Sequence, residues 1–321
     1  MKDWNSSVSV IVPAYNCSAT IDAAIESILQ QSTPVDEVIV VNDGSSDNTR
    51  SVCEAMGKKI KLINQHNQGV AAARNNGIKA ASSEWVAFLD SDDVWLPCRL
   101  EKQFQLLSEF PDLNWVAGRF NRRTKSRSTL SRFFSKDDSE FQLQNALEAL
   151  ASGMSLWTGV LLMRRAIVDS LGGFDEGLHG CEDMDLWIRF GIRERQIGFV
   201  NIALADYTVG QSGSLTGRSS QKIEPTKLQM YRKVKAYASK ATDLQTKDQC
   251  ERILTCLTGR YLFNMSRTGN VSESRKLMQW LRENEMPKLP LKYTWLSHFP
   301  APLIGFLNKV KRISFTPYGS V

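Results

Sequence analysis

One short stretch, Trp85-Val-Ala-Phe-Leu-Asp-Ser-Asp-Asp-Val94, constrains the fold of this chain more than any other. Its apolar residues 86–89 run directly into three carboxylates, those of Asp90, Asp92 and Asp93. A continuous apolar run of this kind is typical of a strand that is buried on both faces of a parallel sheet. Because open α/β sheets bind ligands beyond the carboxyl ends of their strands, the sequence predicts a binding site at this position.

The three neighbouring acids repel one another, and a hard divalent cation would relieve that repulsion. Mg²⁺ and Mn²⁺ suit carboxylate ligands, and Mg²⁺ takes one or two of them and completes its shell with water and phosphate oxygens. The alternative interpretation is a solvated acidic turn that caps the helix predicted after Pro97.

Apolar runs and amphipathic stretches alternate along the first 110 residues. Strands that alternate with helices in this way predict βαβ units and a mostly parallel sheet. From about residue 217 the pattern is helical throughout. We expect strands at 8–12, ended by Pro13, and at 38–41, 61–63, 86–89 and 158–163, helices at 19–30, 69–77, 97–109 and 166–171, and a loop that enters a further helix at 180–189.

A basic segment at 119–140 interrupts this alternation. Its composition favours an exposed, mobile loop with a solvated run of charge. The functional alternative is a lid, or a dock for an anionic acceptor. The basic residues are Arg119, Arg122, Arg123, Lys125, Arg127 and Arg132.

The net charge of +6 conceals an asymmetry between the two ends of the chain. Residues 215–321 hold 19 Lys and Arg against 7 Asp and Glu, whereas residues 1–214 hold 21 against 27. The basic C-terminal part fits an anionic membrane surface or an acidic polymer. Its aromatic segment at 293–307 suits an interfacial position, and packing against the N-terminal part is the alternative. Nucleic acid is not an expected partner, because no aromatic-rich basic motif occurs.

The cysteines and the first residues bear on the compartment. Six cysteines are scattered without a C-x-x-C pair, which favours reduced thiols in a cytoplasmic protein over a disulfide framework or a zinc site. The N-terminus leads directly into a strand and predicts no signal peptide. No apolar run reaches the roughly 18 residues that a spanning helix needs, so none is expected.

Two further acidic positions extend the predicted chemistry. Asp43 ends the strand at 38–41, where its oxygens could accept N–H donors from a nucleotide base. Glu182 and Asp183 lie in the first turn of a predicted helix, whose dipole favours ionised carboxylates, and one of them could act as a general base. A structural acid cluster is the alternative there. Together with a metal for a diphosphate, these positions indicate group transfer from an activated nucleotide to a hydroxyl.

Six motifs, in order along the chain, resemble those of family 2 glycosyltransferases, which are inverting enzymes of GT-A fold that use nucleotide sugars. The resemblance runs from about residue 7 to 110, resumes at residue 172 and covers nearly two thirds of the chain. The motifs are Val8-Ser-Val-Ile-Val-Pro-Ala-Tyr-Asn16, residues 36–49 with Asn42-Asp-Gly-Ser-Ser-Asp-Asn48, residues 67–75, Phe88-Leu-Asp-Ser-Asp-Asp93, Gly172-Gly-Phe-Asp-Glu176 and Glu182-Asp-Met-Asp-Leu-Trp187.

The resemblance implies an α/β fold of GT-A (Rossmann-like) type, with a mostly parallel mixed sheet flanked by helices and a helical C-terminal extension. It implies a glycosyltransferase domain at 1–216, with a nucleotide-sugar-binding half at 1–110 and an acceptor half at 111–216. The helical region at 217–321 lies outside the resemblance.

On the donor side, the resemblance implies that Asp43 hydrogen-bonds the imide nitrogen of a uracil base, so that a UDP-sugar is the expected donor. Thymine would satisfy Asp43 similarly. Asp92 would be the principal metal ligand and Asp90 would face the ribose or a metal-bound water, with Mn²⁺ or Mg²⁺ as cofactor. The expected donor-binding residues are Pro13, Ala14 and Tyr15 around the base, Asn67 and Arg74 near the nucleotide and its phosphates, and Asp90, Ser91, Asp92 and Asp93 at the diphosphate and sugar.

On the acceptor side, the resemblance implies that Asp183 is the catalytic base, with Glu182 and Trp157 nearby. Asp183 would deprotonate an acceptor hydroxyl that attacks the anomeric carbon from the face opposite the leaving group, with inversion. The expected acceptor is a saccharide or lipid-linked saccharide in cell-surface polysaccharide synthesis. The expected location is cytoplasmic, peripheral on the inner face of the membrane.

Other classes fit less of the sequence. Asp90-Ser-Asp-Asp-Val94 also resembles the signature of haloacid-dehalogenase-type phosphatases, in which Asp90 would be the nucleophile and Asp92 the acid and base. This alternative leaves the motifs at 42–49 and 67–75 unexplained. A non-catalytic sugar- or nucleotide-binding subunit would have little need of Asp90, Asp92 and Asp183 together. A dinucleotide oxidoreductase and a P-loop NTPase are excluded for want of their glycine-rich motifs.

Overall fold

The computed structural model describes residues 7–124, 126–131, 138–154, 156–209 and 224–268, together with positions 279 and 283. The chain divides into two compact units, one made of Met1–Ala146 with Ser155–Met230 and the other of Leu147–Met154 with Tyr231–Val321. The domain boundary expected at 216/217 lies outside the described residues.

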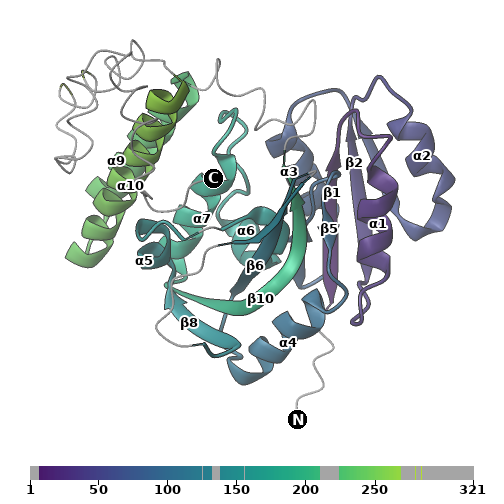
Figure 1. Ribbon diagram of the computed structural model, residues 1–321, viewed down its shortest axis with the longest axis horizontal. Coiled ribbons are helices and arrows are strands. Elements are labelled where there is room, and N and C mark those ends of the chain that lie inside the picture. The colour runs from purple at the N-terminus through teal and green to yellow at the C-terminus, as the bar shows by residue number, and fades with distance from the viewer. Residues whose placement is uncertain are drawn as a thin grey trace. The chain divides into compact units, whose positions relative to one another are not determined.

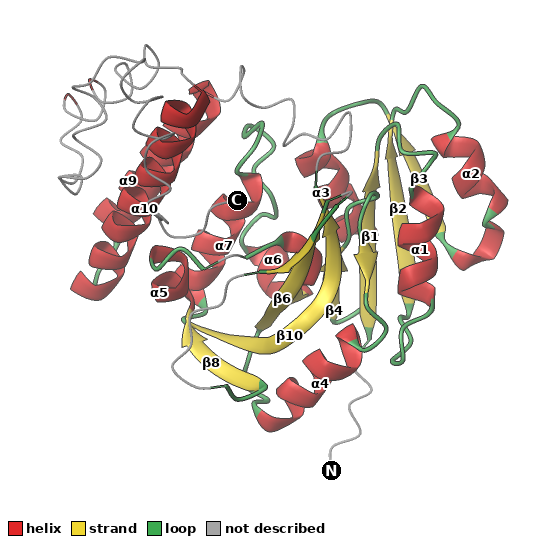
Figure 2. Cartoon of the chain, in the orientation of Figure 1, coloured by secondary structure: helices red, strands yellow, loops and turns green. Residues whose placement is uncertain are grey.

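The first unit is built on a mixed sheet (Figures 1 and 2). Its strand order is β3-β2-β1-β4-β9-β6-β10-β5, with β7 paired to β6 and β8 paired to β10. The strands are β1 (Val8–Ala14), β2 (Glu37–Asp43), β3 (Lys61–Gln65), β4 (Trp85–Phe88), β5 (Val94–Trp95), β6 (Trp115–Arg123), β7 (Ser128–Leu130), β8 (Phe141–Asn145), β9 (Leu162–Arg164) and β10 (Gln196–Thr208).

The direction of the strands decides where the predicted site residues gather. β1, β2, β3 and β4 are mutually parallel. β4 and β6 are each antiparallel to β9, and β10 is parallel to β6, so β4, β6 and β10 point the same way. The carboxyl ends of β1, β2, β4, β6 and β10 therefore lie along one edge of the sheet, where α/β proteins bind ligands.

The opening stretch forms the expected buried strand, because residues 85–89 are all inaccessible to solvent. β1 does not end at Pro13, as the sequence led us to expect, but continues to Ala14. The carbonyl of Ile11 accepts the N–H of Leu89, so the backbone of Ile11 points toward β4. The backbone nitrogen of Pro13, two positions later in the strand, points toward the same side. The β4 ladder has already ended there, and the missing N–H of Pro13 therefore costs no hydrogen bond.

Helices cover both faces of this sheet (Figure 1). Val10, Val12 and Ile25 belong to one apolar cluster, on the face that α1 and α4 cover. On the other face α3 approaches closely, since a Cβ at Gly77 would lie 2.3 Å from the Ile11 side chain. The helices of the first unit include α1 (Ile21–Leu29), α2 (Thr49–Ala55), α3 (Val70–Ala80), α4 (Arg99–Glu109), α6 (Arg165–Ser170) and α7 (Glu182–Arg193), with short 3₁₀ helices at Gly57–Lys59 and Thr158–Val160.

The basic segment is not the loop that we expected. Residues 115–123 form β6, an interior strand, and 128–130 form β7, which turns back along it. Arg119 is only partly exposed and donates to the carbonyl of Ser131 and to the side chain of Asn201. The run of arginines led to the prediction of a loop, although the first residues of the strand, Trp115-Val-Ala-Gly, are buried in the core. Lys125 and Arg132 lie outside the described residues.

The expected strand at 158–163 is also wrong in part, because 158–160 form a 3₁₀ helix and only 162–164 form β9. The predicted α/β class, with a mixed, mostly parallel sheet flanked by helices, is confirmed.

The second unit is helical where it is described. It contains most of α5 (Ala146–Ala151) and α9 (Glu224–Lys240), and all of α10 (Leu244–Thr268). Arg252 of α10 forms an ion pair with Glu148 of α5. Tyr231, Val234 and Ile253 are buried. The aromatic segment at 293–307 and the basic residues after it lie outside the described part of the chain.

Candidate active site

The acidic turn after β4 lies at the edge of the sheet where the strands end. The N–H of Asp93 donates to the carbonyl of Asp90 at 3.1 Å, which closes the turn. β5 follows at once and pairs with β10, so the turn connects β4 to the last strand in the order of the sheet. The Ser91 hydroxyl lies within hydrogen-bonding reach of the Cys17 thiol, which joins the turn to the end of β1.

Asp93 is the buried member of this turn, with 1% of its surface exposed. Its Oδ1 accepts the N–H of Thr208 at 2.6 Å, while its Oδ2 is buried without a protein partner. Burial, together with the charges of Asp90 and Asp92, raises the pKa of Asp93 to about 9. Asp93 is therefore protonated at neutral pH unless a bound cation changes its surroundings.

Asp90 and Asp92 are half-buried and close enough to repel each other. Burial and then the charge of Asp90 raise the pKa of Asp92. The Oδ1 of Asp90 accepts a hydrogen bond from Arg74, whereas Asp92 has no cationic partner among the described ion pairs. A cation at Asp92 would relieve this repulsion.

A buried arginine connects the acidic turn to the start of α7. Arg74 of α3 donates through Nη2 to Asp90 at 2.8 Å and through Nη1 to Glu182 at 3.0 Å. Its guanidinium lies 5.3 Å from the centre of the Phe174 ring. Although burial acts in the opposite direction, Asp90 and Glu182 raise the pKa of Arg74. Two motifs that are far apart in the sequence therefore meet at one side chain.

Asp183 lies in the first turn of α7, which follows Cys181 in a left-handed conformation (φ 65°). One of its oxygens, Oδ1, accepts the N–H of Met184. Burial and the charge of Glu182 raise the pKa of Asp183 to about 7, although Arg74 acts in the opposite direction. A carboxylate with a pKa near neutrality is suited to general-base catalysis.

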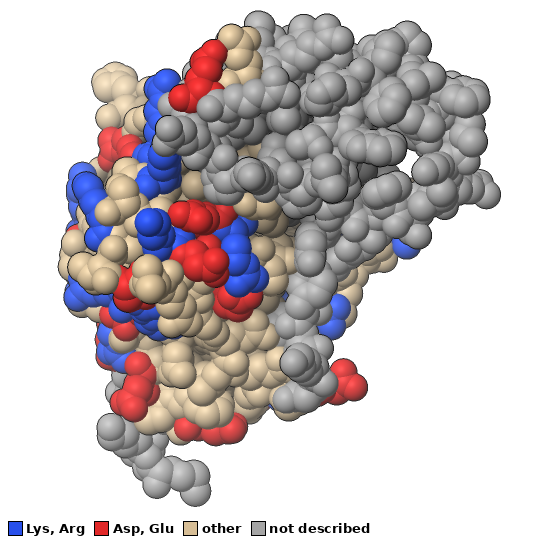
Figure 3. Space-filling view, turned by 90° about the vertical axis from the view of Figure 1, so that its left-hand side faces the viewer, with Lys and Arg blue, Asp and Glu red and all other residues tan. Residues whose placement is uncertain are grey.

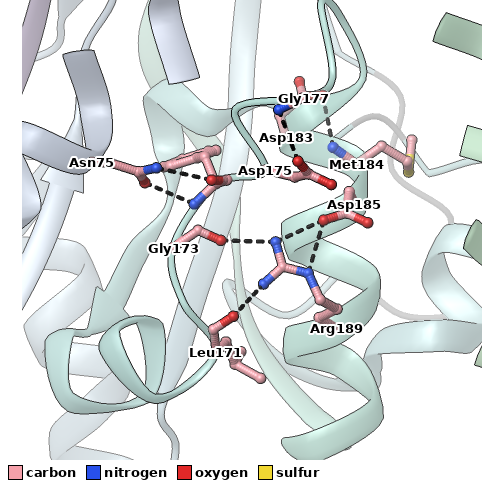
Figure 4. A network of polar contacts seen from close by, with 10 residues as sticks. Asn75, Leu171, Gly173, Asp175, Gly177, Asp183, Met184, Asp185 and Arg189 are labelled. Carbon is pink, nitrogen blue, oxygen red and sulfur yellow. Dashed lines mark hydrogen bonds and ion pairs between the residues drawn. The ribbon is translucent and has the colours of Figure 1, made fainter. Parts of the chain in front are cut away.

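The turn at 171–177 is fastened on both sides (Figure 4). From α3, Asn75 bonds the N–H and carbonyl of Phe174. From α7, Arg189 donates to the carbonyls of Leu171 and Gly173 and is held in turn by Asp185. α3 and the first turns of α7 are thus tied to the same short segment of backbone.

The nucleotide end of the predicted site surrounds Asp43, at the end of β2. Its Oδ1 accepts hydrogen bonds from the Gln65 side chain and from the N–H of Gln68, and its Oδ2 accepts the N–H of Gly69. Asp43 therefore shapes the segment that precedes α3, and Oδ2 keeps capacity for a further donor.

Residues near Asp43 form the rest of the nucleotide end of the predicted site. Tyr15, just after β1, is 48% exposed, whereas Pro13 and Ala14 are buried in the strand. Asn67 is exposed, and its backbone packs against Gly44, since a Cβ on that glycine would lie 2.7 Å from the N atom of Asn67. The loops after β1 and β2 are joined by Asn16, whose Oδ1 accepts the N–H groups of Ser46 and Asp47.

An aromatic cluster lies at the ends of β6 and β10. The Trp157 ring is 5.2 Å from Phe120 and 5.1 Å from Tyr207. The guanidinium of Arg122 lies 5.8 Å from the centre of the Tyr207 ring. The sequence-based interpretation missed Phe120, Tyr207 and Arg122 as neighbours of Trp157, because β6 and β10 were not recognised as adjacent strands.

The donor set at 90–93 suits a hard cation that is shared with a ligand. The unpartnered Oδ2 of Asp93 and the mutual repulsion of Asp90 and Asp92 both favour added positive charge. Among the described residues, no group of three or more His, Cys, Asp or Glu side chains is arranged to hold a metal by itself. Asp92, assisted by Asp90, would therefore depend on phosphate oxygens to complete the shell.

Residues 9–171 match the profile of the family described as "Glycosyl transferase family 2", and the chain belongs to this family. This membership accounts for the motifs at 42–49 and 67–75, which the phosphatase alternative left unexplained.

Several named relatives share parts of the sequence. The UDP-Glc:alpha-D-GlcNAc-diphosphoundecaprenol beta-1,3-glucosyltransferase WfgD of Escherichia coli is 46% identical over 102 residues, which is 31% of this chain and 40% of that protein. The putative teichuronic acid biosynthesis glycosyltransferase TuaG of Bacillus subtilis is 41% identical over 113 residues, 34% of this chain and 45% of that protein. The matches thus span less than half of each relative. The putative glycosyltransferase EpsH of Bacillus subtilis is 28% identical over 288 residues, 86% of this chain and 81% of that protein.

Solved structures of S. aureus TarS share the fold. TarS 1–349 in complex with UDP-GlcNAc matches with a TM-score of 0.67 at 20% identity, covering 94% of this chain and 87% of that one. The complex of the same fragment with UDP matches with a TM-score of 0.63 at 22% identity, covering 82% and 73%. The predicted GT-A architecture is confirmed.

Proposed function

We propose that this family 2 glycosyltransferase moves a hexosyl or N-acetylhexosaminyl group from a UDP-sugar to an acceptor hydroxyl with inversion. The observation that carries the proposal is the bridge from Arg74 to Asp90 and Glu182, because it brings a phosphate-side acidic turn and a candidate base together at one edge of the sheet. The named relatives support the donor class, since WfgD is described as using UDP-Glc and TarS has been crystallised with UDP-GlcNAc.

In this proposal the donor lies along the carboxyl ends of β1, β2 and β4. Asp43 accepts a hydrogen bond from the imide of uracil through Oδ2, with Pro13, Ala14 and Tyr15 around the base. Asn67 and Arg74 lie near the nucleotide and its phosphates, and Arg74 contributes its positive charge there. Asp90 faces the ribose, and Ser91, Asp92 and Asp93 face the diphosphate and the sugar.

Asp183 takes the proton of the acceptor hydroxyl as that oxygen attacks the anomeric carbon from the side opposite the diphosphate. Glu182 and Trp157 lie on the acceptor side. No residue needs to form a covalent intermediate, so the configuration inverts. Mn²⁺ or Mg²⁺ at Asp92 and Asp90 would supply neutralisation of the charge that develops on the diphosphate.

For the acceptor we propose a saccharide on a lipid diphosphate, in the synthesis of a cell-surface polysaccharide. The diphosphoundecaprenol in the description of WfgD and the positive charge of residues 215–321 support this choice. Among the described residues no helix is long and apolar enough to cross a bilayer. On the face drawn in Figure 3, basic and acidic side chains of the described residues are interspersed, so this face offers no uniformly positive surface to an anionic membrane.

The test begins with binding and ends with transfer. The full chain is screened by thermal shift against UDP- and dTDP-sugars with Mn²⁺, because a ligand of the native state raises the unfolding temperature. The sugars that stabilise it are then incubated with short-chain lipid diphosphate acceptors, and the anomeric configuration of the product is determined. We expect stabilisation by UDP-sugars and an inverted product. A chain that no nucleotide sugar stabilises and that transfers none of them would overturn the proposal.

A further inference from the structure

Arg74 lies between the two acidic motifs and belongs to neither. It is 16 residues before Asp90 and 108 residues before Glu182, and its side chain, 6% exposed, is in contact with both. Asp90 directly follows β4, and Glu182 begins α7. Two hydrogen bonds from one guanidinium group therefore connect the start of α7 to the acidic turn.

The surroundings of Arg74 restrict what can replace it. The Phe174 ring lies 5.3 Å from its guanidinium and packs edge-on against Phe88 in the core. The planar guanidinium offers two separate NH₂ groups to two carboxylates, whereas the ammonium of lysine is a compact point charge that does not reproduce this fork. Removing the side chain would leave Glu182 buried without its cation, which is costly.

We propose that Arg74 is a positioning residue, which fixes the first turn of α7 against the turn at Asp90 and thereby sets the place of the Asp183 carboxylate relative to the donor. This inference rests on the proposed function, in which Asp183 is the base. It differs from the expected contact between Arg74 and the donor phosphates, because it assigns Arg74 an effect on the attack of the acceptor.

The charges around Asp183 make this role of Arg74 measurable through the pKa of Asp183. The groups that act on its carboxylate are Glu182 in the same turn, Arg74 from α3 and Asp90 from the end of β4. Arg74 lowers the pKa of Asp183, whereas Glu182 raises it. Loss of the Arg74 charge should therefore raise the pKa of Asp183, and loss of the Glu182 charge should lower it.

Three variants separate positioning from the alternatives: Arg74→Lys, Arg74→Met and Glu182→Gln. Arg74→Lys keeps the charge and loses the fork, so we expect kcat to fall about 10- to 100-fold, as for a misplaced catalytic group, with donor KM nearly unchanged. Arg74→Met should also move the acid limb of the kcat profile to higher pH, and Glu182→Gln should move it to lower pH. Arg50→Met, at an exposed ion pair with Glu54 in α2, is the matched control and should leave kcat and the profile unchanged.

These measurements test the positioning role of Arg74 separately from the proposed glycosyl transfer. A wild-type chain that transfers no sugar overturns the proposed function. An active wild type whose Arg74→Lys variant keeps full kcat, or loses donor affinity alone, overturns the positioning role and leaves the proposed function intact. If Arg74→Met does not fold, the double variant Arg74→Met/Glu182→Leu removes the arginine together with its buried partner, so that Glu182 is not left as a lone buried charge. That double variant should recover the unfolding temperature without recovering kcat, and recovery of both would also overturn the inference.

Discussion

The side-chain amide of Asn75 and the backbone of Phe174 form a reciprocal pair of hydrogen bonds, in which Nδ2 donates to the carbonyl at 2.9 Å and Oδ1 accepts the N–H at 2.8 Å. The glycine before Phe174 is part of the same fit. A Cβ on Gly173, which has a φ of +68°, would lie 2.4 Å from Oδ1 of Asn75. The absence of a side chain at Gly173 thus lets the turn approach α3 closely enough for these hydrogen bonds to form.

Asn75→Ala is expected to lower the free energy of unfolding by about 2–4 kcal/mol, because it leaves a buried backbone donor and a buried acceptor unpaired. The measurement is urea-induced unfolding of the full chain. Asn76→Ala is the matched control, since among the described residues its side chain bonds the partly exposed side chain of Gln65, and its loss should cost under about 1 kcal/mol. Equal losses in the two variants would contradict a specific role of the Asn75–Phe174 pair.

The acid limb of the kcat profile is expected near pH 7. Asp183 acts as a base only when it is ionised, and burial with the charge of Glu182 raises its pKa to about 7. Turnover should therefore rise as the pH increases from 5 to 8 and then level off. Asp183→Asn should lower kcat by at least ~10²-fold and abolish the acid limb while donor binding, measured by calorimetry, stays close to wild type. A residual rate that still follows the same limb would assign the titration to another group.

Asp93 is expected to make the metal-free chain less stable as the pH rises. Burial, Asp90 and Asp92 raise its pKa to about 9, well above the value of an unfolded aspartate. Between these two values the native state binds the extra proton, so stability falls with pH, by up to about 1.4 kcal/mol per pH unit for one proton. Asp93→Asn keeps an acceptor for the N–H of Thr208 and should flatten this dependence, measured by unfolding at pH 5 to 8 with a chelator present.

The local parts of the site could be predicted from the sequence, and its long-range contacts could not. The strand at 85–88 is one uninterrupted apolar run, and Asp90, Asp92 and Asp93 follow it within five residues. β10 was missed because its pairing with β6 contains two register shifts, at 200–203 and 203–206, which break the period of two that identifies a strand. The partners of Arg74 could not be foreseen, because Glu182 reaches it only after more than a hundred residues have folded back onto α3.

Removal of divalent cations is expected to abolish transfer, and added Mn²⁺ or Mg²⁺ should restore it. Asp90 is already engaged by Arg74, so Asp92 is the carboxylate with the greater freedom to bind a cation. Asp92→Asn should weaken Mn²⁺ binding in the presence of UDP by at least about 10-fold in calorimetry, since an outer contact to a metal is worth 10- to 100-fold and a direct ligand more.

Asp22→Asn, at an exposed acid in the first turn of α1, is the control and should bind Mn²⁺ and UDP as the wild type does. Full transfer by a chelated enzyme would contradict the metal assignment, and the stabilisation of the departing diphosphate would then have to come from the cationic side chains of the chain itself.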